Sequence, residues 1–286
     1  YSVLRASTQS SNFIELMDWC RRMDCDIEGL HCETGPGVWE AALQSHTGVE
    51  AADRANIFKT FAKVFFQKRD LMATFMAKWS MQYPGQSGHF HFSVCDANDV
   101  NIFADGTAPQ GMSEAQRFAV GGLQRYLPEL LPMLAPTINS YTRLVKGAWA
   151  PTSATWGVEN RTAAIRVIPG GASSQRIECR VGGADANPYL VAAAVLSAGL
   201  AGIRERQEPE SAVQGNAYEL EDSLPAYLRF ASNLGDAAEK MDGSKLARAS
   251  LGDEFVDHFV MSRRWEVQEY QRSLNNWQLQ RYFEII

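Results

Sequence analysis

The sequence predicts one domain that mixes α-helices and β-strands. In some segments apolar residues recur at helical spacing, and in others they alternate with polar residues, as in amphipathic helices and half-buried strands. The chain has 286 residues, of which 45% are hydrophobic, so it can bury a sizeable core. It contains no internal repeat and no low-complexity linker, and we therefore expect a single catalytic-type domain over residues 1–286.

The first part of the chain predicts two helices separated by a hairpin. Apolar residues have helical spacing over residues 10–24 and 48–70. Between them, residues 34–37 read T-G-P-G, where the proline fixes φ and the flanking glycines can adopt φ > 0. We expect the chain to reverse there, with Glu33 and Val38 as cross-strand partners.

The middle of the chain predicts strands followed by a helix. Residues 71–79 and 88–94 read as strands, and residues 101–106 as a short strand and turn. Residues 113–134 have helical spacing, and we expect that helix to break near Pro128.

The last part of the chain predicts two strands and then mostly helix. Residues 163–170 and 175–181 read as strands. Asn187 and Pro188 predict the start of a long apolar helix, as its N-cap and first helical residue. From about residue 220 the pattern is mostly helical, and the order of helices and strands leaves the sheet topology open.

Charge and cysteine content argue against several classes of function. The net charge is −6 and no basic run occurs, so we expect no nucleic acid or membrane partner. The longest apolar run, residues 189–203, is shorter than the roughly 18 residues of a membrane-spanning helix, and no signal-peptide pattern opens the chain. The five cysteines never occur as C-x-x-C, which is typical of reduced thiols. We expect a cytoplasmic protein.

Three predicted strand segments carry chemically active side chains on one face. Alternation gives these shared faces: His31, Glu33 and Glu40; His89, His91 and Ser93; Arg176, Glu178 and Arg180. Two carboxylates on one hairpin repel unless a cation lies between them, and oxygen and imidazole donors suit Mg²⁺ or Mn²⁺. The arginines indicate an anion at the same place, a combination typical of phosphoryl transfer, here without a Walker-type loop. For each segment alone, a solvated strand face remains the alternative.

Six motifs in order resemble the catalytic domain of the glutamine synthetase family. E-T-G-P-G-V-W-E, residues 33–40, resembles that family's hairpin E-x-A-P-G-Q-x-E, and residues 73–93 contain blocks similar to its A-T-F-M-x-K-P and S-G-x-H-x-H. The other similar blocks are residues 139–151, 160–167, 176–180 and 184–203. The resemblance implies an α+β fold with a curved, mostly antiparallel sheet, a half-barrel, surrounded by helices.

The resemblance also implies a role for each matching residue. The implied ligands of Mg²⁺ or Mn²⁺ are Glu33, Glu40, His89 and Glu178. The implied nucleotide-binding residues are Glu28, His91, Ser93, Arg161 and Arg166. The implied glutamate-binding residues are Arg143 and Arg180, with Trp149 beside them in the flap motif. The implied catalytic residues at the ATP phosphates and the acyl phosphate are Arg161, Arg166 and Arg176.

The resemblance further implies a reaction and an assembly. ATP, as co-substrate, would phosphorylate the γ-carboxylate of glutamate, and an amine would then displace the phosphate to form an amide, a reaction of nitrogen metabolism. The family forms homo-oligomeric rings, often stacked, in which a neighbouring subunit closes each active site. Family members carry an amino-terminal β-rich domain with further metal-binding glutamates, and we expect that domain to be absent from this chain.

One departure from the family pattern concerns the nucleophile. Trp149 stands where the family's flap motif R-L-V-P-G-x-E-A-P has its glutamate. An indole cannot help to deprotonate ammonium, but it can line a pocket for an alkylamine. The sequence therefore leaves open whether ammonia or a small alkylamine is used. It also leaves an alternative to a ligase, a catalytically silent structural relative such as the lens protein lengsin.

Overall fold

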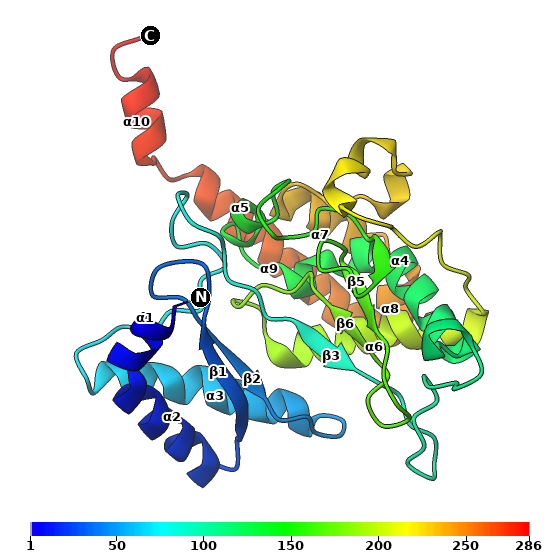
Figure 1. Ribbon diagram of the computed structural model, residues 1–286. Helices are drawn as coiled ribbons and strands as arrows, with labels where there is room; N and C mark the ends of the chain where they lie inside the picture. Colours follow the sequence, from blue (N-terminus) through cyan, green and yellow to red (C-terminus); the bar gives the residue numbers. More distant parts are fainter. Residues whose placement is uncertain (1, 286) are drawn as a thin grey trace.

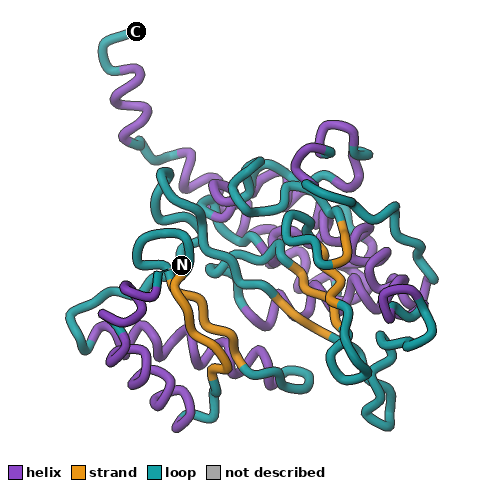
Figure 2. Tube along the Cα trace, viewed as in Figure 1, coloured by secondary structure: helices purple, strands orange, loops and turns teal. Residues whose placement is uncertain are grey.

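The computed structural model describes residues 2–285, in which helices surround two separate sheets (Figures 1 and 2). The strands are β1 (Ile27–Cys32), β2 (Trp39–Leu43), β3 (Phe90–Phe92), β4 (Trp156–Val158), β5 (Ile165–Ile168) and β6 (Arg176–Cys179). The helices are α1 (Val3–Thr8), α2 (Ser10–Arg22), α3 (Glu50–Gln67), α4 (Glu114–Leu134), α5 (Ser140–Arg143), α6 (Pro188–Glu205), α7 (Leu234–Asp242), α8 (Lys245–Leu251), α9 (Asp253–Gln271) and α10 (Asn276–Tyr282).

The hairpin β1–β2 reverses where the sequence predicts. The Glu33 backbone N–H donates to the Val38 carbonyl oxygen at 2.8 Å, and Gly37 has φ +72°, which suits a glycine. The apolar face of the hairpin packs on α2 and α3, where Ile27 and Phe65 belong to one small buried cluster. Alternation along the strands therefore leaves the predicted polar face directed away from this cluster.

The larger sheet has the strand order β3-β6-β5-β4. Strand β6 pairs antiparallel with both β3 and β5, and only β4 pairs in parallel, with β5. The expectation of an open, mostly antiparallel sheet in an α+β fold is confirmed, although the hairpin and the larger sheet form two separate hydrogen-bonded ladders. The main core joins this sheet to α4, α6, α7 and α9.

Helix α4 does not break near Pro128, so that expectation is wrong. The helix continues through both Pro128 and Pro132 to Leu134. A proline inside a helix costs about 3 kcal/mol. The burial of one leucine contributes about 1.5–3 kcal/mol, and the leucines beside these prolines, Leu127, Leu130, Leu131 and Leu134, are all fully buried. Their burial offsets the cost of the prolines.

Residues 71–79 form no strand, so that expectation is also wrong. Side chains take up several of their backbone hydrogen bonds, and no neighbouring strand among residues 2–285 pairs with them. The Lys78 N–H donates to Asn139 Oδ1 at 2.9 Å, and Asn139 Nδ2 donates back to the Lys78 carbonyl at 2.8 Å. The strands expected within 88–94, 163–170 and 175–181 are present as β3, β5 and β6, and the Asn187 side chain caps α6 as predicted.

Helix α3 fixes the hairpin relative to the larger sheet through α6. Lys59 Nζ donates to the Ala186 carbonyl at 2.6 Å, and the Tyr189 hydroxyl donates to Asp53 Oδ1 at 2.6 Å. Helix α10 extends away from the rest of the molecule (Figure 1). All five cysteines are free thiols. Within residues 2–285, every helix is too short or too polar to cross a membrane.

Candidate active site

Strand register aligns three predicted site residues in one row across the larger sheet. Glu178 on the central strand β6 lies opposite His91 of β3 on one side and Arg166 of β5 on the other. Directly opposite residues point to the same face. Because side chains alternate, His89 and Arg180, each two positions from a member of this row, belong to that face as well. Pairing of strands distant in sequence thus assembles the cluster.

The carboxylate of Glu178 is the centre of this cluster. Only 2% of Glu178 is exposed. Arg180 Nη1 donates to its Oε1 at 2.6 Å, Arg166 Nη1 to its Oε2 at 3.1 Å, and His89 Nδ1 lies 3.1 Å from Oε1. Both carboxylate oxygens are therefore engaged, and for Glu178 to bind a metal ion at least one of these contacts would have to open.

The electrostatics of the cluster favour an ionised glutamate and a neutral histidine. Burial acts to raise the pKa of the Glu178 carboxyl, but the His89 hydrogen bond and the charge of Arg180 outweigh it and hold that pKa well below its usual range. Burial lowers the pKa of His91 to about 4, against the attraction of Glu178. The His91 side chain keeps 42% of its surface accessible, so a ligand can reach this ring.

The remaining arginines of the larger sheet differ in how they are held. The Arg166 guanidinium also donates to Glu159, with Nε at 3.1 Å from Oε2. Arg176 Nε lies 3.3 Å from His91 Nδ1, which connects it to the cluster. Arg161 is exposed in the turn between β4 and β5, and Ser93 is exposed just after β3. The structure therefore brings Arg166 and Arg176 into the cluster and leaves Arg161 and Ser93 at the surface.

The polar face of the hairpin holds a second cluster. His31 is directly opposite Glu40 in the strand register, and its Nε2 lies 3.0 Å from Glu33 Oε1 and 3.5 Å from Glu40 Oε2. One ligand atom from each of the three residues lies within 4.8 Å of the other two. Atoms bound at about 2.1 Å to one ion are at most about 4.2 Å apart. This donor set fits a divalent cation after a small side-chain rotation.

Glu28 is not part of the hairpin cluster. It lies exposed at a β-bulge, because the register shifts between Ile27 and Gly29. Glu33 lies five positions further along the chain, which corresponds to roughly 16 Å at about 3.3 Å per residue of strand. Glu28 can therefore reach only the far end of an extended ligand that also touches the hairpin cluster.

Arg143 and Trp149 lie on α5 and the loop after it. Arg143 is 1% exposed, and its guanidinium donates to Ser87 Oγ at 2.9 Å and to the Val181 carbonyl. Trp149 is 63% exposed and has φ +58°. A bulky side chain rarely adopts this left-handed conformation, so the backbone at Trp149 is strained.

Two residues of the clusters were not assigned roles from the sequence. His31 shares the predicted polar face of the hairpin, and alternation alone could have added it to the ligand set. Glu159 holds Arg166, but it lies in a turn with φ +52°, and no local pattern connects it to β6. Only the folded structure identifies Glu159.

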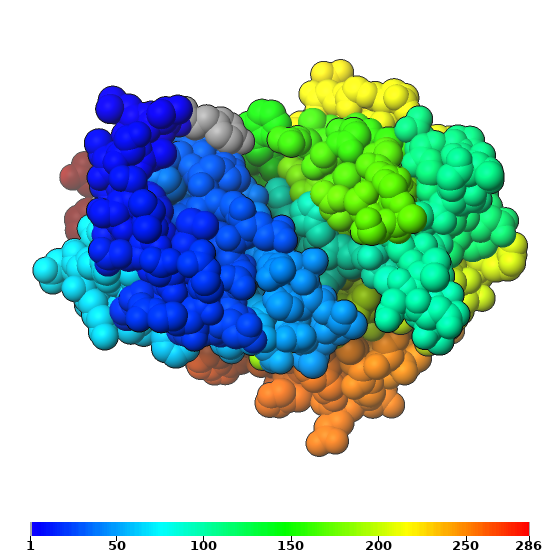
Figure 3. All heavy atoms as spheres, turned by 60° about the horizontal axis from the view of Figure 1, so that its bottom comes forward, coloured from blue at the N-terminus to red at the C-terminus, as the bar shows by residue number. Residues whose placement is uncertain are grey.

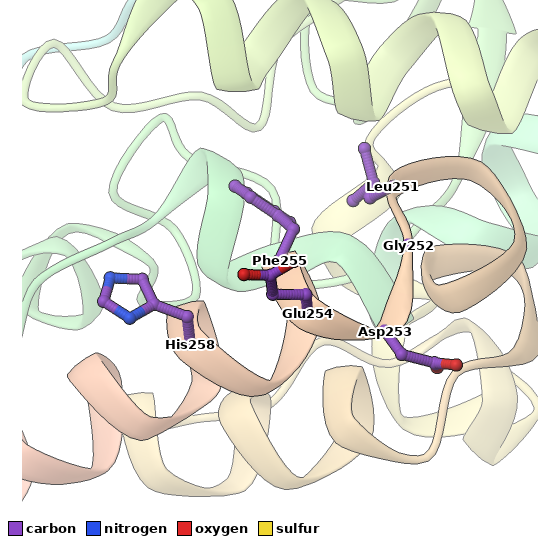
Figure 4. Close-up of a pocket in the computed structure, with 6 residues that line it drawn as sticks. All are labelled: Leu251, Gly252, Asp253, Glu254, Phe255 and His258. Atoms are coloured by element: carbon purple, nitrogen blue, oxygen red, sulfur yellow. The ribbon is translucent and has the colours of Figure 1, made fainter.

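The surface is hollowed next to these clusters. Figure 3 shows a recess between the blue amino-terminal segment and the green segment that includes β5 and β6, with the teal part of the chain around β3 set back between them. A separate pocket of about 480 Å³ lies at the start of α9, lined by Leu251, Gly252, Asp253, Glu254, Phe255 and His258. Figure 4 shows its Asp253 and His258 side chains pointing away from each other, and none of its residues is a predicted site residue.

Comparison with known proteins gives matches along the whole chain. The family model described as the glutamine synthetase catalytic domain matches residues 1–282. Type-1 glutamine synthetase 2 of Dictyostelium discoideum is 44% identical over 288 residues, which cover 100% of this chain and 55% of that protein. The glutamate–isopropylamine ligase of a Pseudomonas species is 36% identical over 286 residues, which cover 100% of this chain and 62% of that protein.

A solved structure has the same fold. The structure titled as conformation 1 of a GmaS/ADP complex has a TM-score of 0.90 at 29% identity and covers 99% of this chain and 66% of its own. Gamma-glutamylethanolamide synthetase GlnA4 of Streptomyces coelicolor is 37% identical over 258 residues, which cover 90% of this chain and 54% of that protein. The chain thus spans little more than half the length of the curated relatives that it matches.

Proposed function

The chain belongs to the glutamine synthetase family, and on that basis we propose that it is the catalytic domain of an ATP-dependent ligase that joins an amine to the γ-carboxylate of glutamate. The observation that carries the proposal is the convergence of His89, Arg166 and Arg180 on the buried Glu178. The similarity to a glutamate–isopropylamine ligase and to a gamma-glutamylethanolamide synthetase supports an amine as the second substrate.

In the proposed reaction, the arginines of the larger sheet bind the transferred phosphoryl group. The γ-carboxylate of glutamate attacks the terminal phosphorus of ATP, which gives γ-glutamyl phosphate and ADP. Glu159 and Glu178 orient the Arg166 guanidinium, which would meet the developing negative charge. Arg161 and Arg176 are the other proposed catalytic residues. The amine then attacks the activated carbonyl and phosphate leaves.

The proposed metal ligands are Glu33, Glu40, His89 and Glu178, with His31 beside the first two. A divalent cation, Mg²⁺ or Mn²⁺, would neutralise phosphate oxygens of ATP when bound there. The hairpin supplies its carboxylates already close together, as the distances from His31 to Glu33 and Glu40 indicate. Glu28, His91 and Ser93 are the proposed nucleotide contacts.

The reaction can be tested by following ADP release from ATP with glutamate and a set of amines. We expect release that requires both glutamate and an amine, and a hydroxamate product when hydroxylamine replaces the amine, because hydroxylamine traps acyl phosphates. If the full-length protein binds ATP and glutamate but releases no ADP with any amine, the silent structural relative becomes the better description.

A further inference from the structure

Two buried glutamine side chains form a network behind the first residue of β6. Gln116 of α4 and Gln175, the residue before β6, are both 0% exposed. Gln175 Nε2 donates to Gln116 Oε1 at 2.6 Å, and Gln116 Nε2 donates to the Arg176 carbonyl oxygen at 3.1 Å. A buried amide without partners destabilises a protein, but a fully bonded network fixes one arrangement of the groups that it joins. The network therefore fixes the backbone at Arg176.

The same network fixes the turn between β5 and β6, residues 169–175. Gln175 Oε1 accepts from the Gly170 N–H at 2.8 Å, which joins the two ends of the turn. The Gln175 carbonyl oxygen accepts from Asn101 Nδ2 at 2.9 Å, and Asn101 is itself buried. Side chains from two other parts of the chain, α4 and the loop before it, thus hold the turn in place.

Gln116 is in turn held at the capped start of α4. Ser113 Oγ accepts from the Gln116 N–H at 3.1 Å and donates to the Ile102 carbonyl oxygen at 2.6 Å. The helix then continues into the main core. An apolar side chain would fill this fully buried position without an amide that has to be desolvated. The two hydrogen bonds of the Gln116 amide are therefore what distinguishes it from a residue that only fills space.

The Arg176 guanidinium depends on this turn for its orientation. Arg176 Nη1 donates to the Ser174 carbonyl oxygen, a group of the turn, at 3.0 Å, and its Nε lies 3.3 Å from His91 Nδ1. Across the part of the chain that the structure describes, no carboxylate pairs with Arg176, whereas Arg166 is paired with Glu178. A shift of the turn would therefore move the Arg176 guanidinium.

We propose that Gln116 is a positioning residue for phosphoryl transfer: through Gln175 and the Arg176 carbonyl it holds the β5–β6 turn, and thereby the Arg176 guanidinium, in the orientation that the reaction needs. The proposal rests on the proposed function, in which Arg176 is a catalytic residue. Gln116 is fully buried, so it acts only through its neighbours and not on substrate. A displacement of about 1 Å in a group that acts on the reacting atoms can lower a rate by about 100-fold.

The test compares Gln116→Met with Gln124→Met in the full-length protein. Gln124 is the matched control, because it lies on the same helix and is 3% exposed. Its amide also makes two hydrogen bonds, to the Ala154 carbonyl oxygen at 2.9 Å and from the Glu210 N–H at 2.8 Å. Both variants should unfold at a lower urea concentration than wild type. Only Gln116→Met should lower kcat, by about 10- to 100-fold, with KM for ATP and glutamate within about threefold of wild type.

Hydrogen exchange of backbone amides measures the restraint without turnover. The amides of residues 170–176 should exchange faster in Gln116→Met than in wild type, and at the wild-type rate in Gln124→Met. Unchanged exchange in Gln116→Met, or faster exchange with an unchanged kcat, would overturn the positioning role. No ADP release by the wild-type protein would contradict the proposed ligase and any role in its reaction, while the exchange rates would still decide whether Gln116 holds the turn.

Gln175→Met tests the same restraint from the other amide. It removes the hydrogen bonds to Gln116 and from Gly170, so it supplies the same two measurements if Gln116→Met does not fold. Because the two amides are proposed to act as one unit, kcat of the double variant should be about equal to that of the weaker single variant. A double variant whose loss of kcat equals the product of the two single losses would show that the amides act independently, and would overturn the proposal.

Discussion

Arg180 Nη1 lies 2.6 Å from Glu178 Oε1, and both residues are almost completely buried. Arg166 donates to the other oxygen of the same carboxylate. Glu178→Gln would therefore leave two guanidinium groups without their shared counter-charge. We expect the free energy of unfolding, measured by urea denaturation, to fall by about 3 kcal/mol.

The control for this variant is Glu159→Gln. Glu159 also pairs with Arg166, but half of its side chain is exposed, so its loss should cost at most about 1 kcal/mol. Equal losses of stability in the two variants would contradict a central role for Glu178.

The stability contributed by Glu178 should depend on pH. The pKa of its carboxyl is lower in the folded protein than in the unfolded chain, where it is near 4.5. The unfolded chain thus takes up a proton first as pH falls, and the contribution is complete above pH 4.5 and lost below it. The difference in Tm between wild type and Glu178→Gln, measured with a chelator present, should be constant from about pH 7 to 5 and shrink at lower pH. A difference in Tm that grows as the pH falls would contradict the pairing of Glu178 with Arg166 and Arg180.

The hairpin cluster should bind Mn²⁺ through its carboxylates. Glu40→Gln removes one charged ligand from the three residues that lie close together. We expect Mn²⁺ affinity, followed by electron paramagnetic resonance, to fall at least about tenfold. Glu114→Gln, which changes an exposed glutamate on α4, is the matched control. Identical Mn²⁺ affinity in both variants would rule out the hairpin as a metal site.

The exposed indole of Trp149 should favour an alkylamine as nucleophile. Burial of one methylene contributes about 0.8 kcal/mol, so a short alkyl tail can offset the carboxylate contact that ammonium would need. We expect kcat/KM for methylamine, ethylamine or isopropylamine to equal or exceed that for ammonia. If kcat/KM for ammonia exceeds that for every tested amine by more than about tenfold, the protein is better described as an ordinary glutamine synthetase with an unusual flap.

Trp149→Gly tests the same residue without adding backbone strain. Glycine adopts the observed φ of +58° freely, so only the indole is lost. The ratio of kcat/KM for isopropylamine to that for ammonia should fall in this variant. An unchanged ratio would show that Trp149 does not contact the amine.

We also expect the full-length protein to form a homo-oligomer, as proposed from the family's ring assemblies. Helix α10 projects from the molecule (Figure 1), and its large apolar side chains Trp277, Leu279 and Tyr282 are exposed, as are Leu274 and Phe283 next to it. An exposed apolar group of this kind is typical of an association surface. Sedimentation of the full-length protein as a monomer at micromolar concentration would contradict the expectation.

The sequence by itself determined the elements whose signals are local. The T-G-P-G sequence predicts the hairpin without help from the rest of the chain, because the residues of a turn determine its backbone conformation. Asn187 and Pro188 determined the start of α6, and strict alternation identified the polar faces of β1, β3 and β6. The resemblance of six motifs to those of the glutamine synthetase family predicted the family and a mostly antiparallel sheet that does not close into a barrel.

Only the tertiary structure decided what depends on a distant neighbour. Residues 71–79 read like a strand, but a strand needs a ladder partner, and the side chain of Asn139 takes up the backbone bonds of Lys78 instead. Pro128 should break a solvated helix, but core packing on both sides of it keeps α4 continuous. Glu159 belongs to the site because the fold brings its turn next to Arg166. Such a contact has no spacing rule, so local sequence could not reveal it.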